Sequence, residues 1–305
     1  MKKPLLITAV IILCLSVLGA GGITWHANSI IKGIADVKVR TTEALLDVYS
    51  SEIEQIHVKS PDKLSISAWH FAKLQPKGVV IVLHGMHGMD ASSMLHEAKF
   101  FNSLGYTAIA VDLRAHGHSD GNKISFGYHE VGDVSAILDW VAQNSEYAGL
   151  PIVLYGHSMG ASVAIRTAAA RSDVSLVVSV AAYESIEQQI ADYMRQANLP
   201  KVLVNTYLPF FKLILRATYG VNPAKSSPMS DIAKLSPRPI LLIHGDVDDQ
   251  TDVLQARNLW AKAGEVAELW VVEGSGHSIV EGNLLEEQNA WYRDRIADFL
   301  HRHLE

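Results

Sequence analysis

The stretch PIVLYGHSMGASVAIRTAAA, residues 151–170, constrains the fold of this chain more than any other segment. Its first part is a short apolar run typical of a buried strand, and its last part is an alanine-rich run that predicts a helix. Between them lies Ser158, with Gly156 two residues before it and Gly160 two residues after it. Glycines allow a strand and a helix to meet closely, and so sharp a turn holds its central residue in a strained conformation with the side chain above the sheet.

Apolar runs and helical patterns alternate along much of the chain. Eight runs are strand-like, at 54–58, 64–71, 78–83, 107–111, 152–155, 176–181, 240–243 and 269–272. Helical patterns lie at 91–104, 129–143, 161–170, 253–263 and 284–303. This alternation predicts an α/β protein with a mostly parallel, eight-stranded sheet and helices on both faces. The first two runs have no helix between them, so we expect an antiparallel hairpin at one edge.

The interval 184–236 is longer than a single crossover helix requires. It is rich in aromatic and aliphatic residues, Phe211 and Leu213 among them, and it ends in a turn-rich segment. We expect it to form a helical cap over the sheet. The apolar side chains could surround an apolar substrate group, or they could serve only to pack the cap's own helices.

The N-terminus differs from the rest of the chain. After Lys2 and Lys3, the run from Leu5 to Ile23 contains no charged residue. Roughly 20 apolar residues cross a bilayer as a helix, and positive residues tend to remain on the cytoplasmic side. This pattern predicts a membrane anchor with the folded domain outside the cytoplasm. A cleavable signal peptide, which would give a secreted protein, is the alternative.

Three segments therefore organise the chain. We expect an anchor or signal peptide at 1–25, a stalk or first helix at 26–50, and the α/β domain at 51–305 with its cap inserted at about 184–236. The net charge is −6 and lysine and arginine form no cluster beyond residue 3, which argues against nucleic acid as a partner. Cysteine occurs once, and the histidine pairs His84/His87 and His116/His118 have no nearby cysteine or H-E-x-x-H pattern to complete a zinc site, so no metal or cofactor is expected.

A serine hydroxyl becomes a useful nucleophile when a base and a carboxylate assist it. His277, in the segment EGSGHS, follows the last strand-like run in a glycine-rich loop and is the candidate base. The segment ILLIHGDVDDQTD places four carboxylates just past a strand: Asp246, Asp248, Asp249 and Asp252. Asp246 is expected to brace the turn and Asp252 to begin a helix, which leaves two candidates for the acid.

Donors for an oxyanion should come from backbone amides near the serine and after the third strand. The N–H of Met159, next to Ser158, is one candidate. The other is the N–H of Met86 in LHGMHG, where Gly85 and Gly88 leave the loop free to turn its amides inward.

The segments LHGMHG, DLRAHGHSDG, GHSMGA, IHGDVDD and GSGHS follow one another in an order that resembles the α/β-hydrolases. Within that superfamily the chain is similar to membrane-anchored serine hydrolases related to monoacylglycerol lipases, esterases and acyl-thioesterases. The resemblance spans about 54–303 and implies the α/β-hydrolase fold with a helical cap. The chain departs from the pattern at Ala115, where such proteins often carry glycine.

The resemblance also implies roles for five residues. Ser158 would be the nucleophile, Asp248 the acid and His277 the base, with Met86 and Met159 as oxyanion donors. The expected activity is hydrolysis of a small-molecule ester or thioester through an acyl-enzyme intermediate.

Two alternatives remain open at this level. One is a serine peptidase, in which Glu184, Glu187 and Asp192 at the cap could hold a peptide amine. The other is a catalytically silent binding protein with the same fold, because a fold does not by itself imply an activity.

Overall fold

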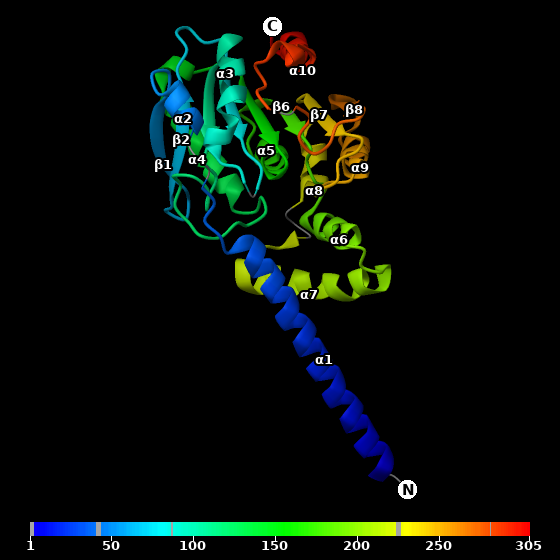
Figure 1. Ribbon diagram of the computed structural model, residues 1–305. Coiled ribbons are helices and arrows are strands. Elements are labelled where there is room, and N and C mark those ends of the chain that lie inside the picture. The colour runs from blue at the N-terminus through cyan, green and yellow to red at the C-terminus, as the bar shows by residue number, and fades with distance from the viewer. Residues whose placement is uncertain (1–2, 41–43, 87, 224–226, 281) are drawn as a thin grey trace.

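The computed structural model describes residues 3–40, 44–86, 88–223, 227–280 and 282–305. A single twisted sheet crosses the body of the molecule (Figure 1). Its strands, in chain order, are β1 (Glu54–Lys59), β2 (Ser65–Phe71), β3 (Val79–Leu83), β4 (Thr107–Val111), β5 (Ile152–His157), β6 (Val174–Val180), β7 (Ile240–Gly245) and β8 (Ala267–Val272). Across the sheet they lie in the order β1-β2-β4-β3-β5-β6-β7-β8.

The strand directions agree with the prediction, including the antiparallel hairpin at one edge. β1 and β2 pair antiparallel, β2 pairs antiparallel with β4, and every later pairing is parallel. The central strands β3, β4 and β5 are buried at every position, as their continuous apolar runs require, whereas β1 at the edge buries Ile56 alone. The predicted eight-stranded, mostly parallel α/β-hydrolase sheet is confirmed.

Helices cover both faces of the sheet (Figure 1). One face packs against α4 (Glu130–Gln143), α5 (Met159–Ala170) and α9 (Val253–Ala263). The other packs against α2 (Ala44–Tyr49), α3 (Leu95–Ser103) and α10 (Ala290–Leu304). Short 3₁₀ helices are η1 (Ala91–Met94), η2 (Ser145–Tyr147), η5 (Gly264–Val266) and η6 (Glu287–Asn289). The last long helix begins later than the expected residue 284, because a turn and η6 precede it.

The helical cap follows β6 and precedes β7. It consists of α6 (Ile186–Gln196), α7 (Lys201–Tyr219), α8 (Pro228–Asp231) and η4 (Ile232–Leu235). Ser185 caps α6 by accepting a hydrogen bond from the N–H of Gln188, and α7 ends where Gly220 takes a left-handed conformation. The cap was predicted from the length of this interval, and it is confirmed as part of the fold.

The predicted membrane anchor is wrong. Across the described residues, no helix combines the length and the apolar character needed to cross a bilayer. The N-terminal segment belongs to α1 (Lys3–Ala35), which continues without a break past the apolar run and buries Ala27, Ile31 and Ala35 in the core. The location outside the cytoplasm and the membrane partner, both inferred from that anchor, are withdrawn with it.

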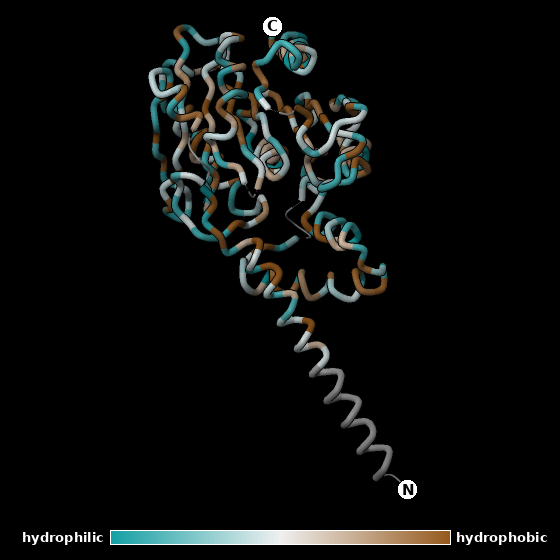
Figure 2. Tube along the Cα trace, viewed as in Figure 1, coloured by the Kyte–Doolittle hydropathy of each residue, from teal (hydrophilic) through white to brown (hydrophobic). Residues whose placement is uncertain are grey.

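The last turns of α1 lie against the cap. α1 crosses α7 beneath the body, while its first turns extend away from it (Figure 1). Hydrophobic residues recur on both helices where they cross (Figure 2). The helix thus joins the cap in enclosing one end of the domain.

Candidate active site

Ser158 stands at the turn from β5 to α5. Its backbone has φ = 54° and ψ = −116°, a left-handed conformation that is rare outside glycine. A Cβ atom on Gly156 would lie 2.3 Å from the carbonyl oxygen of Gly160, and one on Gly160 would lie 2.3 Å from that of Leu83. Only glycine fits at either position, so the two glycines make this strand-to-helix turn possible.

The turn is also fixed by hydrogen bonds. The N–H of Ser158 donates to the carbonyl of Val180 at 2.8 Å, and the carbonyl of Ser158 accepts from Ser162 at 3.1 Å. Ser158 therefore sits at the N-terminus of α5, where the unpaired amides of the first helical turn favour negative charge.

Asp248 and His277 form a hydrogen-bonded pair. Asp248 Oδ2 lies 2.8 Å from His277 Nδ1 and 3.2 Å from His244 Nε2, and Oδ1 accepts from the N–H groups of Gln250 and Thr251. Burial acts to raise the pKa of Asp248, but the hydrogen bonds from His244 and His277 outweigh it and hold the pKa well below its usual value. The carboxylate is thus charged and can only accept, so His277 carries its proton on Nδ1 and leaves Nε2 as an acceptor.

The other carboxylates of this segment have different contacts. Asp246 Oδ1 accepts from the N–H of Gly274 at 2.7 Å and braces the loop that leads to His277. Asp252 is the N-cap of α9, the role expected for it, and Asp249 is exposed. Of the four, Asp248 is the one that contacts His277.

His157, the residue before Ser158, ties the His277 loop to this turn. Its Nε2 lies 3.0 Å from the carbonyl oxygen of His277, and the two rings meet edge to face. Burial and the nearby His277 lower the pKa of His157 to about 4, so its ring is neutral near pH 7. Because the carbonyl can only accept, Nε2 carries the proton.

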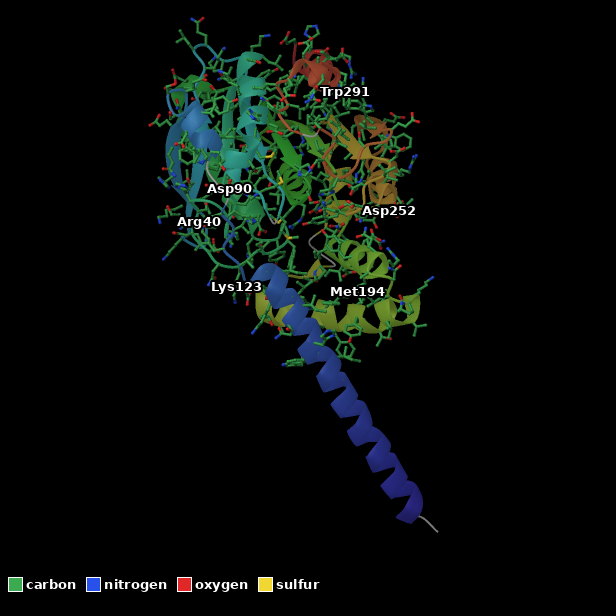
Figure 3. The ribbon with its side chains drawn as sticks, viewed as in Figure 1. Arg40, Asp90, Lys123, Met194, Asp252 and Trp291 are labelled. Atoms are coloured by element: carbon green, nitrogen blue, oxygen red, sulfur yellow. The ribbon has the colours of Figure 1, made fainter. Side chains whose placement is uncertain are left out.

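A cavity of about 420 Å³ opens at Ser158, within the usual range for small-molecule sites. Met86 and Met159 line it beside the serine, so both residues expected to supply amide donors lie at this cavity. Part of its wall comes from the cap, including Met194 of α6 (Figure 3) and Phe211 of α7. Among the described lining residues there is no carboxylate, lysine or arginine.

The three carboxylates considered as amine ligands lie elsewhere and have partners. Glu184 Oε2 accepts from Asn258 at 2.8 Å, and Glu187 Oε2 forms an ion pair with Lys212 at 2.8 Å. Asp192 Oδ2 accepts from Gln255 at 2.7 Å. None of the three lines the cavity at Ser158.

Asp112 and Ala115 hold the loop after β4. Asp112 accepts from the N–H groups of Ala91 and His118, so it braces the loops that these residues belong to. Ala115 has φ = 64°, a conformation that glycine adopts with less strain, which fits the glycine that the resemblance leads one to expect at this position.

Residues of α1 at the cavity were missed from the sequence. His26, Ile30, Ile31 and Ile34 all line it. The spacing of Ala27, Ile31 and Ile34 indicates an apolar helix face, but it does not say what that face covers.

The sheet order, the strained serine turn and the Asp–His pair define an α/β-hydrolase. Within that class, the chain belongs to the family described as serine aminopeptidase, S33, whose model matches residues 74–234.

The chain is also similar to individual proteins, over different shares of its length. The chain is 27% identical to uncharacterized protein YqkD of Bacillus subtilis (strain 168), over 98% of this chain and 97% of that one. It is 36% identical to a human monoglyceride lipase over 32% of this chain and 31% of the lipase. Its fold is similar to that of the Pyrococcus furiosus esterase Pf2001, with a TM-score of 0.67, 24% identity, and coverage of 85% of this chain and 96% of that one.

Proposed function

We propose that this protein is a serine hydrolase that cleaves carboxylic esters of apolar acyl groups through an acyl-enzyme intermediate. One observation carries the proposal: Ser158, on its strained turn, opens onto an apolar cavity at the side of the sheet where Asp248 orients His277. Esters are also the substrates that the names of the human and Pyrococcus relatives indicate.

The reaction follows from the arrangement of the groups. His277 Nε2 accepts the proton of the Ser158 hydroxyl while Oγ forms a bond to the acyl carbon. The carbonyl oxygen becomes an oxyanion, which accepts hydrogen bonds from the N–H groups of Met86 and Met159. The bond to the alcohol oxygen then breaks, and His277 returns the proton to that oxygen.

The second half of the reaction repeats these steps with water. His277 takes a proton from the water as the water oxygen attacks the acyl carbon. The bond between that carbon and Ser158 Oγ then breaks, and His277 returns the proton to Oγ, which releases the acid and restores the free serine. Asp248 stabilises the positive imidazole in both halves. A thioester of the same acyl group would react through the same groups, with a thiol as the leaving group.

An apolar cavity favours an ester substrate over a peptide with a charged N-terminal amine. A substrate amine needs a carboxylate, and those expected to supply one are bonded to Asn258, Lys212 and Gln255 away from the cavity. The family description keeps peptidase activity as the competing outcome.

A fluorophosphonate probe tests the proposal because it reacts with activated serines. Wild-type protein should be labelled at Ser158, and the variant Ser158→Ala should lose both labelling and hydrolysis of p-nitrophenyl butyrate. Ser162→Ala, one turn along α5, is the matched control and should retain both. Labelling of Ser158→Ala equal to the wild type would reject the assignment.

Turnover of different substrates by the same protein samples identifies the substrate class. Turnover of p-nitrophenyl esters and of a butyryl thioester should exceed that of leucine p-nitroanilide. Faster cleavage of the anilide would make the protein a peptidase, and no turnover with no labelling would make it a silent binding protein.

A further inference from the structure

The N-terminal helix forms part of the wall of the cavity at Ser158. Four side chains of α1 line it: His26, Ile30, Ile31 and Ile34. They lie at i, i+4, i+5 and i+8, so they share one face of the helix, which turns towards the cap. Leu203, Tyr207 and Phe211, on one face of α7, also line the cavity.

Contacts at several points fix α1 in this position. Ala27, Ile31 and Ala35 are completely or almost completely buried, and the carbonyl of Ala35 accepts from the N–H of Ile124 at 2.8 Å. Tyr219 of α7 donates to Asp36, just past the helix, at 2.9 Å. The part of α1 that lines the cavity is therefore packed into the domain.

The outer end of the cavity is marked by a polar pair. His26 Nδ1 lies 3.0 Å from the hydroxyl of Tyr207, and the two rings meet edge to face with centroids 5.7 Å apart. Beside this pair Ile30 is 38% exposed and Leu203 is 44% exposed, although both line the cavity. An apolar wall thus runs from the serine to partly exposed side chains at the outer end.

We propose that α1 completes an acyl-binding channel and that its residues set the acyl chain length. A linear, unbranched acyl chain would extend from Ser158 between α1 and α7 towards the His26–Tyr207 pair, and would cover Ile30 and Leu203. The inference rests on the proposed ester hydrolysis. It adds a substrate class, esters of medium to long linear acids, and assigns the selection of that class to α1.

Ile30→Trp tests the channel by filling its outer end. We would measure kcat/KM for p-nitrophenyl butyrate, octanoate and laurate, and compare the laurate-to-butyrate ratio with that of the wild type. The ratio should fall about tenfold or more. A pocket that cannot hold the outer methylene groups of laurate loses their binding energy, and a single methylene group can change kcat/KM by about that factor. The matched control is Trp25→Ala, on the same helix but outside the cavity and 72% exposed, whose ratio should not change.

Tyr207→Phe provides a second variant that only removes a hydroxyl. Loss of the bond to His26 should loosen the outer end and raise the palmitate-to-laurate ratio. The inference is overturned if both variants keep wild-type ratios while Ser158 is still labelled by the fluorophosphonate. Absence of labelling and of ester turnover in the wild type would instead reject the proposed function.

Discussion

Ser158 is held in a backbone conformation that costs on the order of 1–3 kcal/mol. The surrounding structure maintains it because Gly156 and Gly160 allow β5 and α5 to approach to a distance that no side chain would permit. Ser158 lies in the lining of the cavity. Strain at one residue thus exposes a side chain between two otherwise buried elements.

Asp248 is distinguished from its neighbours by its contacts. It accepts from two histidines and two backbone amides, and its side chain is completely buried. His244 Nε2 also lies 2.9 Å from the carbonyl of Thr251, so this second histidine fixes the loop that carries Asp248.

Replacement of Asp248, the proposed acid, should therefore affect turnover far more than replacement of Asp246 or Asp249. Asp248→Asn removes the charge that fixes the Nδ1–H tautomer of His277, and turnover of p-nitrophenyl butyrate should fall by up to about 10⁴. Asp249→Asn, at an exposed position, should stay close to the wild type. Asp246→Asn should lower the melting temperature slightly, since its bond to Gly274 weakens. Near-normal turnover in Asp248→Asn with a large loss in either neighbour would move the acid to that neighbour.

At the scale of elements, α7 presents two different apolar faces. Phe211 is 2% exposed and lines the cavity, whereas Leu213 is 58% exposed and lines a separate groove with Trp25. Two residues along a helix are about 200° apart around its axis, so side chains that look equivalent in the sequence face opposite sides.

This difference predicts different effects of alanine at the two positions. Phe211→Ala should enlarge the cavity, change the relative rates on butyrate and laurate esters, and destabilise the protein by about 3–5 kcal/mol. Leu213→Ala should leave the relative rates unchanged and alter stability by no more than about 0.5 kcal/mol. Urea unfolding and the ester series measure both effects. A change in chain-length preference in Leu213→Ala would contradict the assignment of the two faces.

At the scale of the whole molecule, the sheet separates two hydrophobic cores. Beside the core under α3 and α10 lies a second cavity of about 390 Å³, lined in part by Glu97, Tyr155 and Tyr292. The Tyr155 and Tyr292 hydroxyls lie 3.0 Å apart and pair with each other. Burial raises the pKa of Glu97 from 4.5 to about 7.

The raised pKa makes global stability depend on pH. The unfolded chain releases the Glu97 proton near pH 4.5, while the folded protein keeps it up to about pH 7, so stability falls as the pH rises between these values. Glu97→Gln cannot ionise and should gain stability relative to the wild type on going from pH 5 to pH 8. The gain should be on the order of 2 kcal/mol, since one pKa unit corresponds to about 1.4 kcal/mol and solvent reaches part of the side chain.

Urea unfolding at both pH values measures this gain. Glu265→Gln, at an exposed position, is the control and should show the same difference from the wild type at pH 5 and pH 8. Glu97→Gln would contradict the prediction if its difference from the wild type were also the same at both values.

Local sequence was sufficient to predict much of this protein. The eight strands, the hairpin at one edge and the cap interval follow from the period and length of apolar runs, which depend on neighbouring residues. The serine turn follows in the same way, because Gly156, Ser158 and Gly160 act within one turn of the chain. The order of the motifs added the expected acid, base and oxyanion donors through a resemblance.

Other features depended on which distant segments meet. Asp248 and Asp249 are neighbouring residues with identical side chains, so their chemistry does not distinguish them. Only the packing of the loops after β7 and β8 brings Asp248 to His277. The apolar N-terminal run predicted an anchor, yet the helix that contains it continues to Ala35 and packs against α7, more than 150 residues away along the chain. Sequence periodicity fixes which face of a helix is apolar, but the partner of that face is chosen by long-range packing, and here the choice places α1 in the wall of the cavity.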